Sequence, residues 1–131
     1  MKKFAYRQYS IRELYNSYTR EEIIFPQQYA EINWIKQRKE KFLKKINQGY
    51  PMRGIAIRVD FVLEKNCTIP KIKKNIVFGQ QELKTIFEYL ETDFKKLDED
   101  KKRKFFNNLI PATLLFDFTD EEITKAIELL R

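Results

Sequence analysis

Gly79-Gln80-Gln81 is the segment of this sequence best suited to hold a polar ligand. The glycine separates an apolar, β-branched run from a helical pattern, so the backbone can approach a ligand closely at this turn. The first N–H groups of the following helix have no intrahelical partner, and together with side-chain amides they bind anions. We therefore expect a ligand-binding site at Gly79, Gln80 and Gln81. The structural alternative is that the glycine makes the turn, Gln80 caps or precedes the helix, and Gln81 lies on its surface.

A strongly basic segment is the second candidate site. Residues 35–48 have the spacing of a helix, and Gly49 follows as its C-terminal cap. The apolar stripe of this helix consists of Ile35, Phe42, Leu43 and Ile46. Cationic side chains on one helix suit the phosphates of nucleic acid or an acidic protein, although a solvated lysine surface has the same composition. The expected nucleic-acid-binding residues are Lys36, Arg38, Lys39, Lys41, Lys44 and Lys45. Neutralising Lys36, Lys41 and Lys45 together should weaken DNA binding and flatten its salt dependence.

Acidic and aromatic clusters offer two other chemistries. Asp117 and the acids of residues 120–122 contain the carboxylates that a metal-dependent nuclease needs, and residues 98–100 form a similar group. We favour the interpretation that these acids cap helices, because the positive end of a helix attracts them. Four tyrosines near the N-terminus alternate with arginines, as in surfaces that stack single-stranded bases, but packing in the core or on the surface is the favoured alternative. The four are Tyr6, Tyr9, Tyr15 and Tyr18.

Composition excludes several classes of site. The 131 residues contain no histidine and one cysteine, Cys67, so a zinc site, a Ser-His or Cys-His catalytic pair and an intramolecular disulfide are not expected. No run approaches the 18 apolar residues of a membrane span. We expect a cytoplasmic protein with no membrane partner. The net charge of +7 is uneven: residues 1–75 carry 17 Lys+Arg and 7 Asp+Glu, whereas residues 76–131 carry 9 and 12.

The elements that position these residues predict an α+β domain spanning residues 1–131, with a small mixed sheet surrounded by helices. Alternating apolar residues predict a strand over 55–63, which pairs with a second strand over 71–78. The other expected strands cover 22–26 and 112–118. Helices are expected from Ser10 to Tyr18, over 35–48, after Gly79, over 98–108 and after Thr119.

The turn and its surroundings resemble the ParB/sulfiredoxin-like superfamily, and most closely the N-terminal domain of GmrSD-type restriction endonucleases. In that family the turn reads Asp-Gly-Gln-Gln-Arg, followed by Leu, Thr and an apolar residue. Other pieces of the chain resemble the same domain in the same order. They are residues 9–15, Phe25-Pro26 with Trp34, residues 42–46 with Gly49-Tyr50-Pro51, and residues 110–123. The resemblance implies a ParB-like fold.

Family members couple nucleotide binding to DNA processing, and their polar site contains the aspartate and arginine of the turn and an earlier Gln-Arg pair. Phe78 replaces the aspartate in this chain, and Glu82 replaces the arginine. Counting back from Trp34 places the Gln-Arg pair on Tyr29-Ala30. Alanine offers nothing to a phosphate, and glutamate repels one. The resemblance therefore implies a degenerate site that is not catalytic in this form.

We expect a degenerate ParB-like domain that binds DNA or a nucleotide during nucleic-acid processing, in a restriction, phage-defence, viral or plasmid setting, without hydrolysing nucleoside triphosphates. One alternative is a protein-interaction or inhibitor module that kept the fold and lost the chemistry. A second alternative is an active DNA nuclease that uses replacement residues. Nucleic acid is the expected partner, with a protein as the other candidate; the residues specify no metal, no cofactor and no oligomeric state.

Overall fold

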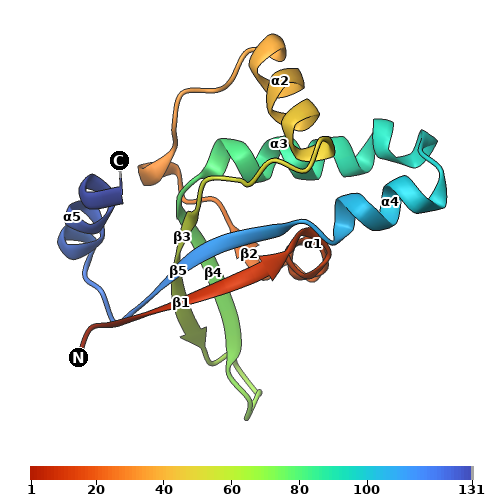
Figure 1. Cartoon of the computed structure of the whole chain (residues 1–131). Coiled ribbons are helices and arrows are strands. Elements are labelled where there is room, and N and C mark those ends of the chain that lie inside the picture. The colour runs from red at the N-terminus through yellow and green to blue at the C-terminus, as the bar shows by residue number, and fades with distance from the viewer. Residues whose placement is uncertain (131) are drawn as a thin grey trace.

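The computed structural model describes residues 1–130, in which helices surround one five-stranded sheet (Figure 1). The strands are β1 (Lys3–Ser10), β2 (Ile23–Ile24), β3 (Ile55–Val62), β4 (Lys71–Phe78) and β5 (Leu109–Phe116). The helices are α1 (Ile11–Thr19), α2 (Lys36–Asn47), α3 (Gln80–Glu91), α4 (Glu99–Phe106) and α5 (Asp120–Leu130), with short 3-10 turns at Gln27–Tyr29 and Asp93–Lys96. The α+β class and the small mixed sheet are therefore confirmed.

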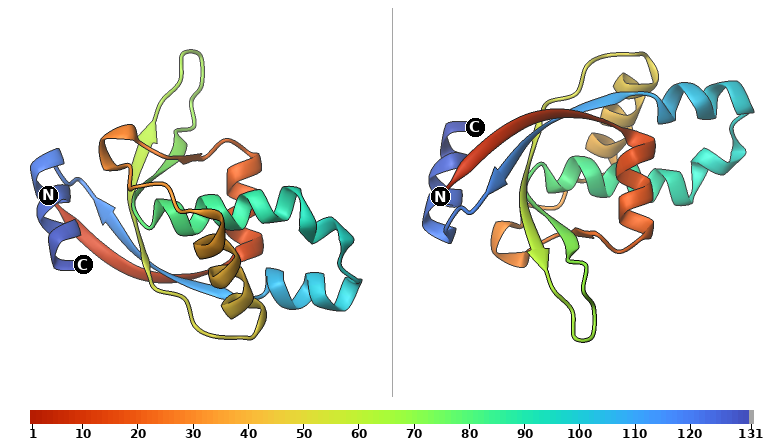
Figure 2. Two further views of the ribbon diagram at one scale, coloured as in Figure 1. Left: turned by 90° about the horizontal axis from the view of Figure 1, so that it is seen from above. Right: turned by 90° about the horizontal axis from the view of Figure 1, so that it is seen from below.

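The sheet has the order β1-β5-β3-β4-β2. β1 and β5 are antiparallel, as are β3 and β4, whereas β3 with β5 and β2 with β4 are parallel. The expected pairing of the strands over 55–63 and 71–78 is confirmed, and their hairpin projects away from the rest of the molecule (Figure 2). The sheet thus consists of two antiparallel pairs, β1–β5 and β3–β4, which join where β5 and β3 run parallel, and β2 adds a parallel edge strand.

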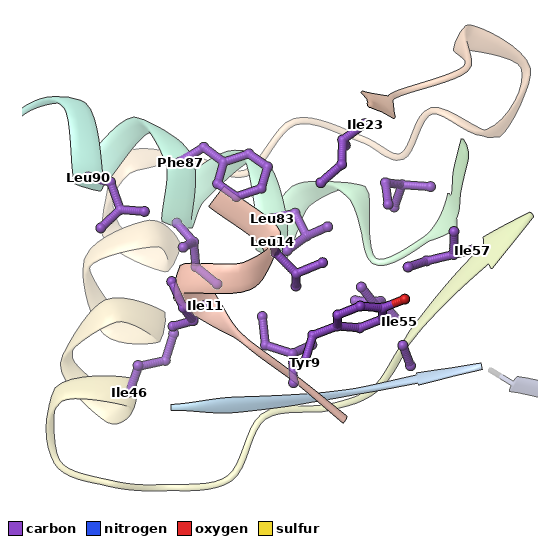
Figure 3. Packing of buried hydrophobic residues seen from close by; sticks show 14 of the residues in the cluster. Tyr9, Ile11, Leu14, Ile23, Ile46, Ile55, Ile57, Leu83, Phe87 and Leu90 are labelled. Carbon is purple, nitrogen blue, oxygen red and sulfur yellow. The ribbon is translucent and has the colours of Figure 1, made fainter. Parts of the chain in front are cut away.

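Alternation along the central strands gives the sheet two apolar faces. Ile55 and Ile57 lie in the main core with residues of α1, α2, α3 and α4, whereas Ala56 packs with Ile123 and Ile127 of α5. Figure 3 shows Leu14, Leu83 and Phe87 packed together in the main core. α5 therefore covers one face of the sheet, and the other helices cover the opposite face.

Three strands differ from the sequence prediction, and the shortest, β2, covers Ile23–Ile24 rather than 22–26. β1 was missed because its first six residues are exposed, so its pattern lacks a buried face. β5 begins at Leu109 rather than at residue 112, and it includes Pro111. Pro111 pairs with Gln8 of β1, but the pairing of β5 with β3 starts only at Ala112. The missing N–H of the proline therefore costs no hydrogen bond to β3.

Helix boundaries follow the expected caps. Ser10 and Glu13 form a capping box at the start of α1, and Thr119 and Glu122 form another before α5. α2 ends in a Schellman motif: Gly49, at φ +85°, donates its N–H to the Ile46 carbonyl, and Tyr50 donates to the Lys45 carbonyl. The assignment of Ile35 to the apolar stripe was wrong, because Ile35 precedes α2 and is 68% exposed.

Candidate functional site

A cavity of about 380 Å³ lies between α2, the segment 50–53 and the start of α3. Four cationic side chains line it, together with three aromatic rings and one carboxylate. The lining residues are Trp34, Arg38, Lys41, Phe42, Lys45, Ile46, Tyr50, Pro51, Met52, Arg53 and Glu82. Its walls are therefore mostly apolar and aromatic, with an excess of positive charge.

α2 places only half of its basic residues on this cavity. Arg38, Lys41 and Lys45 are spaced by three and four positions, so they lie on one face of the helix. The other three expected residues lie outside the lining in the described part of the chain. Lys36 pairs with Glu40 at 3.9 Å, Lys39 pairs with Glu88 of α3 at 3.3 Å, and Lys44 is exposed. The structure thus divides the six expected nucleic-acid-binding residues into two sets of three.

Aromatic side chains form one wall of the cavity. The ring of Trp34 meets the ring of Phe42 edge-on at 5.2 Å, and the Arg38 guanidinium lies 4.4 Å from the centre of the indole. Tyr50 is 59% exposed, and the Schellman motif at the end of α2 fixes its backbone. Because aromatic rings beside cations stack on bases while the cations bind phosphates, this wall suits a nucleotide unit.

Glu82 lies at the base of the cavity and pairs with Arg53. An Arg53 nitrogen donates to Glu82 Oε1 at 3.1 Å, and the Glu82 side chain is 7% exposed. Glu82 Oε2 is buried and has no hydrogen-bond partner within residues 1–130. Burial raises the pKa of Glu82 above its ordinary value of 4.5, although the Arg53 charge opposes this shift. The Arg53 guanidinium also lies 4.7 Å from the ring centre of Phe78, so residues 78 and 82 contact the same arginine.

An internal carboxylate occupies the N-terminus of α3. Gly79 adopts φ +85°, and its N–H donates to Glu31 Oε1 at 2.9 Å. The Gln80 N–H donates to the same oxygen at 3.3 Å. A negative charge is stabilised at this position by the unpaired N–H groups and by the helix dipole. At the turn where the sequence predicts a ligand site, the two backbone N–H groups therefore bind a carboxylate of the chain itself, that of Glu31.

Gln80 and Gln81 tie the segment 26–34 to α3. The Gln80 amide donates to the carbonyls of Pro26 and Ile76 at 3.0 and 2.8 Å. Gln81 Oε1 accepts the Trp34 N–H at 2.9 Å. Gln81 is 3% exposed, so the alternative that placed it on the helix surface is wrong. Because Gln81 fixes the backbone of Trp34, the glutamine turn and the basic helix contribute to one connected site.

Two residues of the acidic clusters cap helices, as favoured from the sequence: Asp98 accepts the Lys101 N–H at the start of α4, and Glu122 accepts the Thr119 N–H before α5. Asp120 instead pairs with Arg58 at 2.9 Å, and the exposed Asp117 lies 4.0 Å from the N-terminal amine. The Lys2 ammonium and the Thr119 N–H both donate to the Glu122 carboxylate, and these bonds lower its pKa to about 2. Residues 1–130 contain no group of three or more His, Cys, Asp or Glu residues placed to hold a metal ion.

The tyrosine cluster divides between core and surface. Tyr9 is 4% exposed, and burial raises its pKa. Tyr15 and Tyr18 pack against Phe87, with Tyr18 stacked on it at 4.4 Å. Tyr15 and Tyr18 are half-buried, and Tyr6 is the most exposed of the four, at 77%. The packing interpretation is therefore right for Tyr9, Tyr15 and Tyr18.

Sequence reasoning missed Glu31 and Arg53, which hold the two ends of the site. Glu31 lies 48 positions from its partner Gly79, and Arg53 lies 29 positions from Glu82, so no local pattern links either pair. The Gly-Tyr-Pro turn at residues 49–51 was the available signal for Arg53, because it fixes the direction of the chain beyond α2.

Across residues 1–130, every helix is too short or too polar to cross a lipid bilayer. Compared with models of protein families, with curated proteins and with solved structures, the chain gives no match.

Proposed function

We propose that this chain is a degenerate ParB-like domain that binds nucleic acid through the cavity beside α2 and hydrolyses no nucleotide. The observation that carries the proposal is the lining of that cavity: four cations and three aromatic rings surround a single buried carboxylate. The resemblance to the GmrSD-type N-terminal domain supports the ParB-like assignment, and the mixed α+β sheet agrees with it. The proposed setting is restriction, phage defence or plasmid maintenance.

Arg38, Lys41 and Lys45 bind the phosphates in this proposal. Within residues 1–130 none of the three has an ion-pair partner, whereas Lys36 and Lys39 on the same helix do. Cations without a neutralising carboxylate keep their full attraction for a phosphate, and binding releases the counterions around the nucleic acid. Tyr50, which is 59% exposed, supplies the ring on which a base stacks, and Trp34 lines the same cavity.

The altered residues around the turn support binding without hydrolysis. Glu31 places its carboxylate where a phosphate would meet the N-terminus of α3. Glu82, whose pKa is raised by burial and by the Glu31 charge, replaces the arginine of the family pattern with an acid, and Ala30 has no charged group. We therefore expect no phosphate release from nucleoside triphosphates with DNA present, across divalent metal ions. Measurable turnover would favour the alternative of an active enzyme that uses replacement residues.

The single tryptophan of the chain provides a direct test. Trp34 lines the cavity, so titration with a single-stranded oligonucleotide should change its fluorescence, and the affinity should fall as salt rises. The test variant is Arg38→Gln/Lys41→Gln/Lys45→Gln. The matched control is Lys36→Gln/Lys39→Gln/Lys44→Gln, which removes the same charge from the same helix.

We expect the test variant to lose about tenfold or more in affinity, and its slope of log K against log salt to fall by about 2, because each phosphate contact with a single strand contributes about 0.7. The control variant should keep most of the affinity and slope. Equal losses of affinity in both variants would mean that only the total charge of α2 attracts the nucleic acid, which would refute the proposed site. Circular dichroism of both variants checks that α2 stays folded.

A protein-interaction module is the second candidate function, and the β3–β4 hairpin is the observation that favours it. The hairpin projects from the molecule (Figure 2). Its apolar side chains are exposed, with Phe61 62%, Leu63 64% and Ile69 78% accessible. Exposed apolar clusters are typical of protein-binding surfaces. If the hairpin binds a protein, Phe61→Ser/Ile69→Ser should abolish its capture while leaving oligonucleotide binding unchanged.

A further inference from the structure

A second cavity, of about 620 Å³, adjoins the first at the end of α2. Ile46, in the last turn of α2, lines both cavities. The second cavity extends from the last turn of α2 to α4, and Lys101 and Lys104 line its α4 side. Gln48 and Tyr89 add polar groups to its walls. The positively lined surface is therefore longer than the site beside α2.

The basic run of α4 also divides into paired and unpaired cations, as on α2, where, within residues 1–130, Lys44 is the one unpaired cation outside the cavities. Residues 101–104 read Lys-Lys-Arg-Lys. Lys102 pairs with Glu99 at 3.7 Å, and Arg103 pairs with Asp100 at 2.9 Å. Lys101 and Lys104 have no ion-pair partner within residues 1–130, and these are the two that line the cavity. On both helices the cations that line the cavities have no carboxylate partner, and the paired cations lie elsewhere.

We propose that the ligand is a single strand of nucleic acid that runs from the first cavity over the end of α2 into the second, where Lys101 and Lys104 bind its backbone phosphates. This inference rests on the proposed function, and it specifies that the ligand is a nucleic-acid strand and not a free nucleotide. A mononucleotide bound in the first cavity does not reach Lys101 and Lys104, whereas a longer strand does. A duplex keeps its bases stacked inside the helix, so its rings cannot reach Tyr50 or Trp34 in a concave site.

The length of the oligonucleotide tests this path. A trinucleotide and a single strand of about 12 nucleotides, within the range that comparable single-strand sites cover, are titrated against three proteins. These are the unaltered chain, Lys101→Gln/Lys104→Gln, and the control Lys102→Gln/Arg103→Gln. Both variants remove two positive charges from α4, and only the first removes them from the cavity.

We expect the unaltered chain to bind the longer strand more tightly than the trinucleotide. Lys101→Gln/Lys104→Gln should weaken binding of the longer strand severalfold and lower its salt slope by about 1.4, at about 0.7 per phosphate. Trinucleotide binding should stay unchanged, and the control should behave as the unaltered chain does. A duplex of the same sequence should bind more weakly than the single strand.

Four results would overturn the inference while leaving the proposed function standing. They are equal affinity for both lengths, equal losses in the two variants, tighter binding of the duplex, and a variant that loses thermal stability without losing affinity. The last result would mean that Lys101 and Lys104 only complement the negative end of α2. If the unaltered chain binds neither strand, both the proposed function and this inference fail.

Discussion

The carboxylate of Glu31 accepts the backbone N–H of Gly79 at 2.9 Å, which joins the loop after the first 3-10 turn to the N-terminus of α3. Two backbone donors therefore meet an internal anion at the point where the sequence indicates a ligand site. The same turn fixes Glu82 at the base of the cavity and Gln81 against Trp34. The stability of the fold and the shape of the cavity thus both depend on residues 79–82.

Removing the Glu31 carboxylate should destabilise the fold and expose the helix N-terminus. We expect Glu31→Ala to lower the free energy of unfolding by about 1 kcal/mol, because two N–H groups lose their acceptor and the helix dipole loses its anion. Inorganic phosphate should then raise the melting temperature of the variant more than chloride at equal ionic strength. Glu40→Ala, which removes an exposed carboxylate from α2, should show neither effect. A similar response to phosphate in the unaltered chain would contradict the idea that Glu31 fills the site.

A side chain at Gly79 should lower the free energy of unfolding. A Cβ on Gly79 would lie 2.6 Å from Ile55 Cγ2 and 2.9 Å from Glu82 Oε2, at φ +85°. We expect Gly79→Ala to cost about 2 to 5 kcal/mol, combining left-handed strain with overpacking. Gly49 has the same φ, but a Cβ added there would meet no atom within 4 Å, so Gly49→Ala should cost only about 1 to 2 kcal/mol from strain. Urea denaturation of both variants gives the comparison, and equal costs would show that the packing around Gly79 can relax.

Gln81 should matter for the position of Trp34. Gln81→Ala leaves the Trp34 N–H without its acceptor and removes a donor from Asn33, so we expect a loss of about 1 to 3 kcal/mol. Trp34 fluorescence should also change in the native state, before global unfolding. Gln37→Ala, an exposed position on α2, serves as the control and should alter neither quantity. Native fluorescence identical to that of the unaltered chain would mean that packing on Phe42 alone fixes the indole.

The stability of the chain should depend on pH in opposite ways at two glutamates. The folded pKa of Glu82 is raised above 4.5, so the stability contributed by its protonated form is present below pH 4.5 and is lost as pH rises through the folded pKa. The stability of Glu82→Gln relative to the unaltered chain should therefore increase from pH 4 toward pH 7.

Hydrogen bonding to the Ser10 N–H lowers the pKa of Glu13, so the stability that the ionised Glu13 side chain contributes is present above pH 4.5 and is lost in acid. Glu13→Gln should be destabilising at neutral pH, with the difference vanishing in acid; thermal melts across pH check both signs.

Several elements were predictable because their signals are local. Ser10 with Glu13, Thr119 with Glu122, and Gly79 each mark a helix start within four residues, and alternation along residues 55–62 marks a buried strand. β1 escaped prediction because its first six residues are exposed and only Tyr9 near its end is buried, so no alternation marks it. Ile35 was misplaced because a single apolar residue does not show whether a helix has already begun.

The sequence by itself determined the α+β class, most helix and strand positions, the glycine turn and the excess of positive charge on α2. Only the tertiary structure decided that Glu31 fills the N-terminus of α3, that Arg53 meets Glu82, and that Arg38, Lys41 and Lys45 line a cavity while Lys39 pairs with Glu88. The physical reason is range. Caps and periodicity depend on neighbours within a few residues, whereas the charge around a site depends on which distant side chains the packed helices bring within a few ångströms of each other.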